Sequence, residues 1–139
     1  MAGFSGHTLA DEILNFVYRG VAISIEANLY LRLLVSPSSR SGGGIETNYG
    51  GYSRYALLRS TGGIWAIAPS SGRLTNAIEI AVGSDATSTG NGILNSFDIV
   101  DTPSGAFTKL YNGGPIINPV TVVVGKQVIF DPNALLITF

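Results

Sequence analysis

The side chains that could carry out acid–base or nucleophilic chemistry are few and widely spaced in this sequence. His7 is the only histidine, and it lies close to the N-terminus. A Ser–His–acid triad needs a histidine held between two partners, whereas a terminal histidine is usually an ordinary solvated side chain. The nine carboxylates are scattered over predicted loops, strand ends and the start of one helix. We therefore expect no catalytic residues, no metal site and no cofactor.

Two glycine runs could suggest a phosphate-binding loop, but their context argues against one. Residues 42–44 and 50–51 lack the Gly-Lys-Ser/Thr ending of such loops, and neither run joins a strand to a helix. The acids Asp85, Asp98 and Asp101 likewise lack the spacing of a calcium-binding loop. Loop flexibility is the simpler interpretation of these glycines, so no enzyme motif is identified.

Aromatic residues form the remaining candidate site. Tyr49, Tyr52 and Tyr55 surround a glycine-rich segment, and the only tryptophan, Trp65, follows soon after. Such rings could stack on sugars or nucleic-acid bases, but they could equally pack a sheet edge against its own loop. We favour packing in the core and at interfaces. Carbohydrate binding through Tyr49, Tyr52 or Trp65 is the alternative.

The composition indicates one soluble domain with an unusually uncharged surface. A chain of 139 residues is long enough to bury a core without cross-links, and it contains no cysteine. Only 12% of its residues are charged, about half the usual share, so much of the surface must be small polar or apolar residues. The net charge of −1 offers no basic field to nucleic acid or an anionic membrane. No apolar run approaches the length of a membrane span, and the N-terminus lacks the features of a signal peptide.

A single helix is predicted near the N-terminus, over residues 8–19. Thr8 followed by Asp11 resembles a capping box, and Gly20 is a typical C-terminal stop. Apolar residues recur at three- and four-residue steps, which gives the helix one apolar face. We expect this face to pack over one end or face of the sheets.

The strongest strand signal is residues 29–35. Every odd position is apolar, and Tyr30 and Leu34 partly cover the other face, which is typical of a strand in the middle of a sandwich. Further strands are predicted over residues 54–59, 64–68, 74–82, 93–100, 106–111, 120–124, 127–130 and 135–139. Their spacing predicts a mainly all-β fold, an antiparallel β-sandwich of jelly-roll type with one short N-terminal helix. Residues 8–139 would form this single domain.

Two segments carry few local constraints. Residues 1–7 are predicted to form a flexible N-terminal arm, and residues 36–51 a long loop rich in glycine and serine. Ordering such segments costs conformational entropy that a partner surface can offset. We therefore expect both to become ordered only in an assembly, with Phe4 and Tyr49 as apolar anchors.

Four segments share their order and spacing with a known family over almost the full chain. They are residues 9–20, residues 27–34, residues 46–56 with the stretch Gly-Gly-Tyr-Ser-Arg-Tyr-Ala at 50–56, and parts of residues 97–139. In these segments the chain resembles small tailed-phage virion proteins of the tail-fibre or head-decoration type. The resemblance implies a non-enzymatic structural protein that decorates or cements the capsid or forms part of the tail-fibre apparatus. A carbohydrate-binding module for a host receptor is the alternative.

The resemblance also implies partners and a location. The protein would act in the virion after synthesis in the host bacterial cytoplasm. It would bind copies of itself, as a homotrimer, and other virion proteins such as the major capsid protein or tail proteins, but neither nucleic acid nor membrane. Phe4, Tyr49 and Tyr52 are the expected contacts. The low charge agrees with this, because a free monomer would expose larger apolar patches than isolated proteins normally tolerate.

Overall fold

The computed structural model describes residues 3–59, 63–68 and 72–138, so Met1, Ala2 and Phe139 of the predicted arm and last strand lie outside it. Within these residues the chain forms one helix, α1 (His7–Arg19), and eleven short strands. The strands are β1 (Phe4–Ser5), β2 (Asn28–Ser36), β3 (Ile45–Glu46), β4 (Tyr55–Leu58), β5 (Trp65–Ala68), β6 (Arg73–Asn76), β7 (Ile80–Val82), β8 (Leu94–Val100), β9 (Leu110–Val120), β10 (Val128–Phe130) and β11 (Leu136–Thr138).

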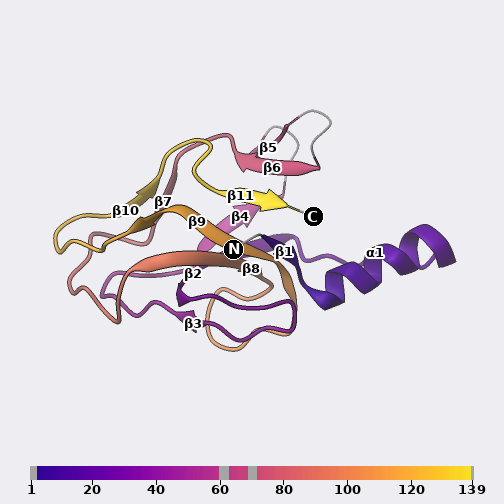
Figure 1. Ribbon diagram of the computed structural model, residues 1–139, viewed down its shortest axis with the longest axis horizontal. Coiled ribbons are helices and arrows are strands. Elements are labelled where there is room, and N and C mark those ends of the chain that lie inside the picture. Colours follow the sequence, from indigo (N-terminus) through magenta and orange to yellow (C-terminus); the bar gives the residue numbers. More distant parts are fainter. Residues whose placement is uncertain (1–2, 60–62, 69–71, 139) are drawn as a thin grey trace.

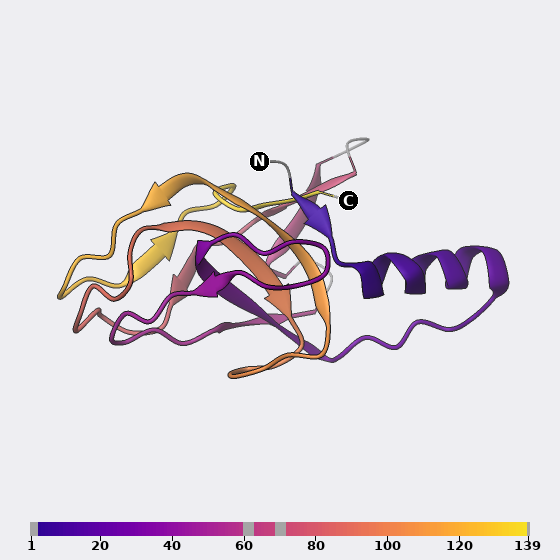
Figure 2. The ribbon, with the colours of Figure 1, turned by 60° about the horizontal axis from the view of Figure 1, so that its bottom comes forward.

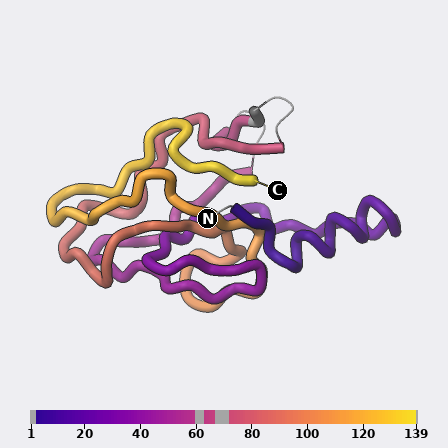
Figure 3. The backbone as a smooth tube through the Cα atoms, in the orientation of Figure 1, coloured from indigo at the N-terminus to yellow at the C-terminus, as the bar shows by residue number. Residues whose placement is uncertain are grey.

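The strands form two layers, as Figure 1 shows. The large sheet has the order β1-β9-β8-β2-β3, and β4 also pairs with β2. Two smaller sheets, β10-β7 and β11-β6-β5, form the second layer. All described pairs are antiparallel, which confirms the predicted all-β sandwich. The two ends of the described chain lie side by side, and a Cβ atom on Gly3 would be 2.5 Å from Thr138 Oγ1 (Figure 3).

One apolar core joins the two layers. It contains side chains of the large sheet, such as those of Leu31, Leu33 and Phe97, and side chains of the β10-β7 sheet, such as those of Ile80, Val82 and Phe130. The predicted central strand is confirmed, because β2 lies between β8 on one side and β3 and β4 on the other. Successive side chains of β2 point to opposite faces, and buried apolar residues occur on both of them. This is the pattern expected of a strand that is covered on both sides.

Strand β9 covers residues 112–115, which lie between the strands predicted over residues 106–111 and 120–124. The chain passes straight through this Asn-Gly-Gly-Pro segment as part of one strand. Glycine is needed at position 113 because of close packing and not because of a turn. A Cβ atom there would lie 2.5 Å from Phe4 Cζ and 3.2 Å from Asp98 Cβ. The strand predicted over 120–124 is also wrong, because β9 ends at Val120 and no strand follows before β10. The strand predicted over 106–111 begins only at Leu110.

The single strand predicted over residues 74–82 is divided into β6 and β7. Asn76 lies at the division and is fully buried. Its side-chain amide donates to Ile78 O at 2.9 Å and to Asp131 O at 2.8 Å, and its Oδ1 accepts from Leu135 N–H at 2.9 Å. These bonds turn the chain from one small sheet into the other, which alternation of apolar residues alone does not reveal.

The segments predicted to lack local structure make contacts within their own chain. Phe4 and Ser5 pair with β9, and Gly6 N–H donates to Tyr111 O at 2.7 Å. In the long loop, Ser38 Oγ donates to Asp98 Oδ2 at 2.8 Å, and β3 pairs with β2. The flexibility of the arm in solution, and the ordering of both segments only in an assembly, stay predictions.

Candidate interaction surface on helix α1

Helix α1 begins directly at the edge of the large sheet. It starts at His7, one residue before the predicted start, and its N-cap is Gly6, with no side-chain hydrogen bond at the cap. The predicted Thr8 cap is therefore wrong. A Cβ atom at position 6 would lie 1.9 Å from Leu110 O, so the chain needs glycine to enter the helix this close to β9. The predicted stop is confirmed, because Gly20 has a left-handed φ of 67°.

The first turns of α1 are fixed to the sandwich. Leu9 is buried, and Ile13 packs partly against the core. The Lys109 ammonium forms an ion pair with the Glu12 carboxylate and donates to Ser24 O at 3.0 Å. The same ammonium lies 5.0 Å from the centre of the Tyr111 ring. Lys109 therefore holds both the helix and the segment that returns from it to β2.

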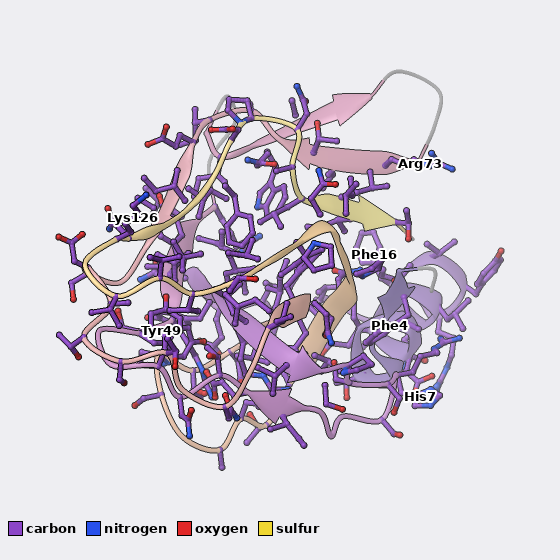
Figure 4. All side chains as sticks on the ribbon, turned by 60° about the vertical axis from the view of Figure 1, so that its left-hand side comes forward. Phe4, His7, Phe16, Tyr49, Arg73 and Lys126 are labelled. Carbon is purple, nitrogen blue, oxygen red and sulfur yellow. The ribbon has the colours of Figure 1, made fainter. Side chains whose placement is uncertain are left out.

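Beyond these turns α1 projects from one end of the molecule, as Figures 1 and 2 show. Its apolar side chains there are exposed: Leu14 by 55%, Phe16 by 55%, Val17 by 60% and Tyr18 by 79%, with Val21 after the helix exposed by 49%. We call these five residues the α1 surface. The prediction that the apolar face packs over the sheets thus holds only at Leu9 and Ile13 and is wrong for the outer turns. Figure 4 shows Phe16 on the helix, away from Lys126.

The α1 surface is wide and uncharged. At 100° per residue, its four helical members span about 200° of the helix circumference. The charged side chains of α1 lie on the remaining side, where Glu12 pairs with Lys109 and Arg19 Nη1 donates to Asn15 Oδ1 at 3.0 Å. The surface is therefore mainly apolar and aromatic, and the hydroxyl of Tyr18 is its one polar side-chain group. None of the described helices is long and apolar enough to cross a membrane.

The predicted contact tyrosines are directed into the protein. Tyr49 is only 2% exposed, and burial raises its pKa to about 12. Tyr52 is half-buried, and its hydroxyl donates to Glu46 Oε1 at 2.7 Å and accepts from Leu33 N–H at 3.1 Å. Burial, followed by the bond to Glu46, raises the Tyr52 pKa as well. Tyr49 is thus buried within its own chain, and Tyr52 uses its hydroxyl inside the chain. The roles of Phe4, Tyr49 and Tyr52 as contacts with partners stay predictions. Phe4 is half-buried against Gly113.

A shallow pocket of about 320 Å³ lies beside Tyr52 and Arg54, but its charged groups are already paired. Arg54 binds both carboxylate oxygens of Glu46 at 2.8 Å and donates to Thr102 O at 3.0 Å and Gly105 O at 2.7 Å. Burial raises the Glu46 pKa, but hydrogen bonds from Arg54 and Tyr52 outweigh it and lower the pKa overall. The guanidinium nitrogens of Arg54 are all bonded within the chain, which leaves none to bind a ligand. Arg54 therefore serves to hold the loop after β8.

The candidates for chemistry are not brought together. His7 is exposed at the start of α1. In residues 3–59, 63–68 and 72–138 no three acidic or histidine side chains are grouped as a metal site requires. Sequence reasoning identified α1 and its apolar face, but it assigned that face to the core. In the structure, the outer part of that face is exposed on the projecting helix.

The structure defines a class before any comparison: an antiparallel β-sandwich whose projecting N-terminal helix has an exposed apolar surface. Comparison with known families gives a match between residues 4–138 and the model for Podophage GP4 fiber I protein gp80. The chain therefore belongs to this family of phage tail-fibre proteins, which confirms the resemblance to tailed-phage virion proteins. A comparison with curated proteins found no match.

Proposed function

We propose that this protein is a non-enzymatic structural subunit of the tail-fibre apparatus, and that it works by binding copies of itself and neighbouring virion proteins. The family supports a structural role in the virion. Since the family description names a fibre protein, we favour the tail over a decorating or cementing position on the capsid. This choice also favours tail proteins over the major capsid protein as neighbours.

The α1 surface is the observation that carries this proposal. Four apolar side chains, each more than half exposed, lie close together on the helix that projects from the sandwich, and Val21 follows directly after it. Contiguous apolar patches on soluble proteins mark interaction sites, and aromatic residues such as Phe16 and Tyr18 often dominate their binding energy. The first turns of the helix are fixed by Leu9 and Lys109, so the surface is presented in a defined direction.

The carbohydrate-binding alternative has less support. It relied on Tyr49, Tyr52 or Trp65 as stacking platforms, but Tyr49 is buried and Tyr52 is hydrogen-bonded within the chain. Trp65 is partly buried and packs against the core. A glycan array gives a direct test, because saturable binding that is lost in Trp65→Ala would restore this alternative.

The location of the protein on intact particles tests the proposal. Antibody-labelled particles viewed by electron microscopy should carry the label at the tail. Regular labelling over the capsid would contradict the tail position and favour decoration. Absence of the protein from purified particles would contradict a structural role altogether.

A further inference from the structure

We propose that Asn91 is a site of spontaneous deamidation, and that the reaction loosens the loop of residues 83–93 from the segment of residues 46–51. The chain contains two Asn-Gly sequences, at residues 91–92 and 112–113. Such sequences favour deamidation, because glycine has no side chain to obstruct the attack of its backbone nitrogen on the preceding side chain. The surroundings of the two sequences differ, and they identify Asn91 as the reactive one.

The reaction needs only the chain and water. The Gly92 backbone nitrogen gives up its proton to solvent and attacks Cγ of Asn91. The new N–Cγ bond closes a succinimide ring, while the Cγ–Nδ2 bond breaks and Nδ2 takes up a proton and leaves as ammonia. Water then adds to one of the two ring carbonyls and the bond from that carbon to the ring nitrogen breaks. The product at position 91 is an aspartate or an isoaspartate.

The Gly92 nitrogen has room to make this attack. Asn91 and Gly92 are exposed in a turn, outside any strand. Within residues 3–59, 63–68 and 72–138, the Gly92 N–H donates no backbone hydrogen bond. A Cβ atom at position 92 would meet only Val35 Cγ1, at 4.0 Å. The attack requires rotation about the Cα–C bond of Asn91, and an exposed turn allows this rotation without opening a sheet.

The side-chain amide of Asn91 is held with its carbonyl polarised. Its Oδ1 accepts from Asn48 N–H at 3.2 Å, and its Nδ2 donates to Glu46 O at 3.2 Å. Negative charge develops on Oδ1 during the attack, so the Asn48 N–H stabilises it as an oxyanion donor does. Both bonds are at the long end of the normal range, so they hold the amide loosely.

The second Asn-Gly sequence is protected by the large sheet. Asn112 and Gly113 lie in β9, and both pair with β8 on one side and β1 on the other. The Asn112 Nδ2 donates to Ser5 Oγ at 3.2 Å. Ring closure would take Asn112 out of its extended conformation, so the sheet must open locally before the reaction can occur.

The loop and the segment are held together by a row of hydrogen bonds that ends at Asn91. Thr87 N–H donates to Gly50 O at 2.9 Å, and Gly50 N–H donates to Ser88 Oγ at 2.8 Å. Both parts lie at the end of the molecule away from α1 (Figures 1 and 2). Deamidation at Asn91 removes the donor to Glu46 O and places a carboxylate beside that carbonyl, which weakens one end of the row. It also changes the net charge from −1 to −2.

An isoaspartate has a further effect, because it adds a carbon atom to the backbone at position 91. The neighbouring backbone is already closely packed: a Cβ atom on Gly90 would lie 2.5 Å from Tyr49 N and 2.7 Å from Asn48 Oδ1. A longer backbone therefore has to move the loop away from the segment.

The test compares the two asparagines in one folded, full-length wild-type chain. The protein is incubated at mildly alkaline pH, digested, and mapped by chromatography and mass spectrometry, which separate the asparaginyl, aspartyl and isoaspartyl peptides. Conversion should be at least about tenfold faster at Asn91 than at Asn112, because Asn112 reacts only from the opened sheet. In urea, where the chain is unfolded, the two conversion rates should become similar.

Hydrogen exchange measures the consequence. After incubation, the amides of Gly50 and Thr87 should exchange faster, while those of β8 keep their rates. Asn91→Gln is the control, because its longer side chain closes a ring much more slowly, so its exchange should not change during the incubation. The inference would be overturned by a folded chain that keeps Asn91 intact while the unfolded chain reacts, or by equal conversion at Asn112. Conversion at Asn91 without faster exchange would overturn the loosening of the loop.

Discussion

Arg32 and Asp98 face each other in register on the neighbouring strands β2 and β8, and they form a two-pronged ion pair inside the protein. Arg32 Nε donates to Asp98 Oδ1 at 2.8 Å, and Nη2 donates to Oδ2 at 2.6 Å. Asp98 is fully buried and also accepts from Ser38, while Arg32 donates to Gly43 O at 3.0 Å. The guanidinium carbon lies 4.6 Å from the centre of the Phe107 ring. One ion pair thus connects two loops to the centre of the sheet.

The first prediction concerns this pair. Arg32→Ala leaves the buried Asp98 carboxylate without its counter-charge, which should lower the free energy of unfolding by about 3–5 kcal/mol. Denaturant unfolding measures the change. Arg40→Ala is the control, because Arg40 is exposed in the loop held by Arg32, and it should change stability by less than about 0.5 kcal/mol. Equal effects of the two substitutions would refute a special role for the pair.

The second prediction concerns Gly113. An alanine there places Cβ 2.5 Å from Phe4 Cζ, so Gly113→Ala should displace β1 and lower the free energy of unfolding by about 1–3 kcal/mol. Phe4→Ala removes the ring that Cβ would meet. In the double variant the cost of Gly113→Ala should therefore become smaller, as a double-mutant cycle in thermal unfolding would measure. Strict additivity would show that the two residues do not clash.

The third prediction concerns Asn76. Asn76→Ala leaves Ile78 O, Asp131 O and Leu135 N–H without this partner, and should cost at least about 2 kcal/mol of folding free energy. Thr75→Ala, one residue away, removes an exposed hydrogen bond to Asn133 and should have a much smaller effect. Urea unfolding compares the two. A similar loss in both variants would mean that the buried amide does not hold the β6–β7 turn.

The fourth prediction is a pH dependence carried by Glu46. Hydrogen bonds from Arg54 and Tyr52 more than offset burial, so the Glu46 pKa is lower in the folded chain than its ordinary value of 4.5. The unfolded chain therefore takes up this proton first as the pH falls. The stabilising effect is present above pH 4.5 and is lost as the pH falls through the folded-state pKa. Glu46→Gln should flatten this part of the stability–pH curve, and an unchanged acid slope would contradict the assignment.

The fifth prediction concerns the attachment of α1. Lys109→Met removes the ion pair to Glu12 and the bond to Ser24 O but keeps an apolar stem. Because the pair is partly exposed, the global stability should change by less than about 1 kcal/mol. The amides of α1 should nevertheless exchange with solvent faster, while those of β2 and β8 keep their rates. Hydrogen exchange measured by mass spectrometry distinguishes this local loosening from general destabilisation.

The parts of the fold that depend on neighbouring residues could be predicted from the sequence. Alternating apolar positions identified β2, and Gly20 marked the end of α1. The parts that failed depend on residues far apart in the chain. Gly113 resembles a turn residue unless its contact with Phe4 is known, and the partner of Arg32 lies 66 positions away.

The candidate site shows the same limit. An apolar helix face is equally compatible with packing on its own core and with binding another chain. The sequence of α1 therefore predicted the face, but only the structure shows that its outer turns leave the sandwich.

Helix α1 is not a free tail, because the chain leaves the large sheet at β1 and returns to it at β2. These two strands are separated by β9 and β8. A mechanical load applied to the tip of the helix, such as a fibre experiences when a particle is held at its host, would be divided between two well-separated strands. Lys109 joins the outgoing and returning segments at their base, so neither strand would bear the load alone.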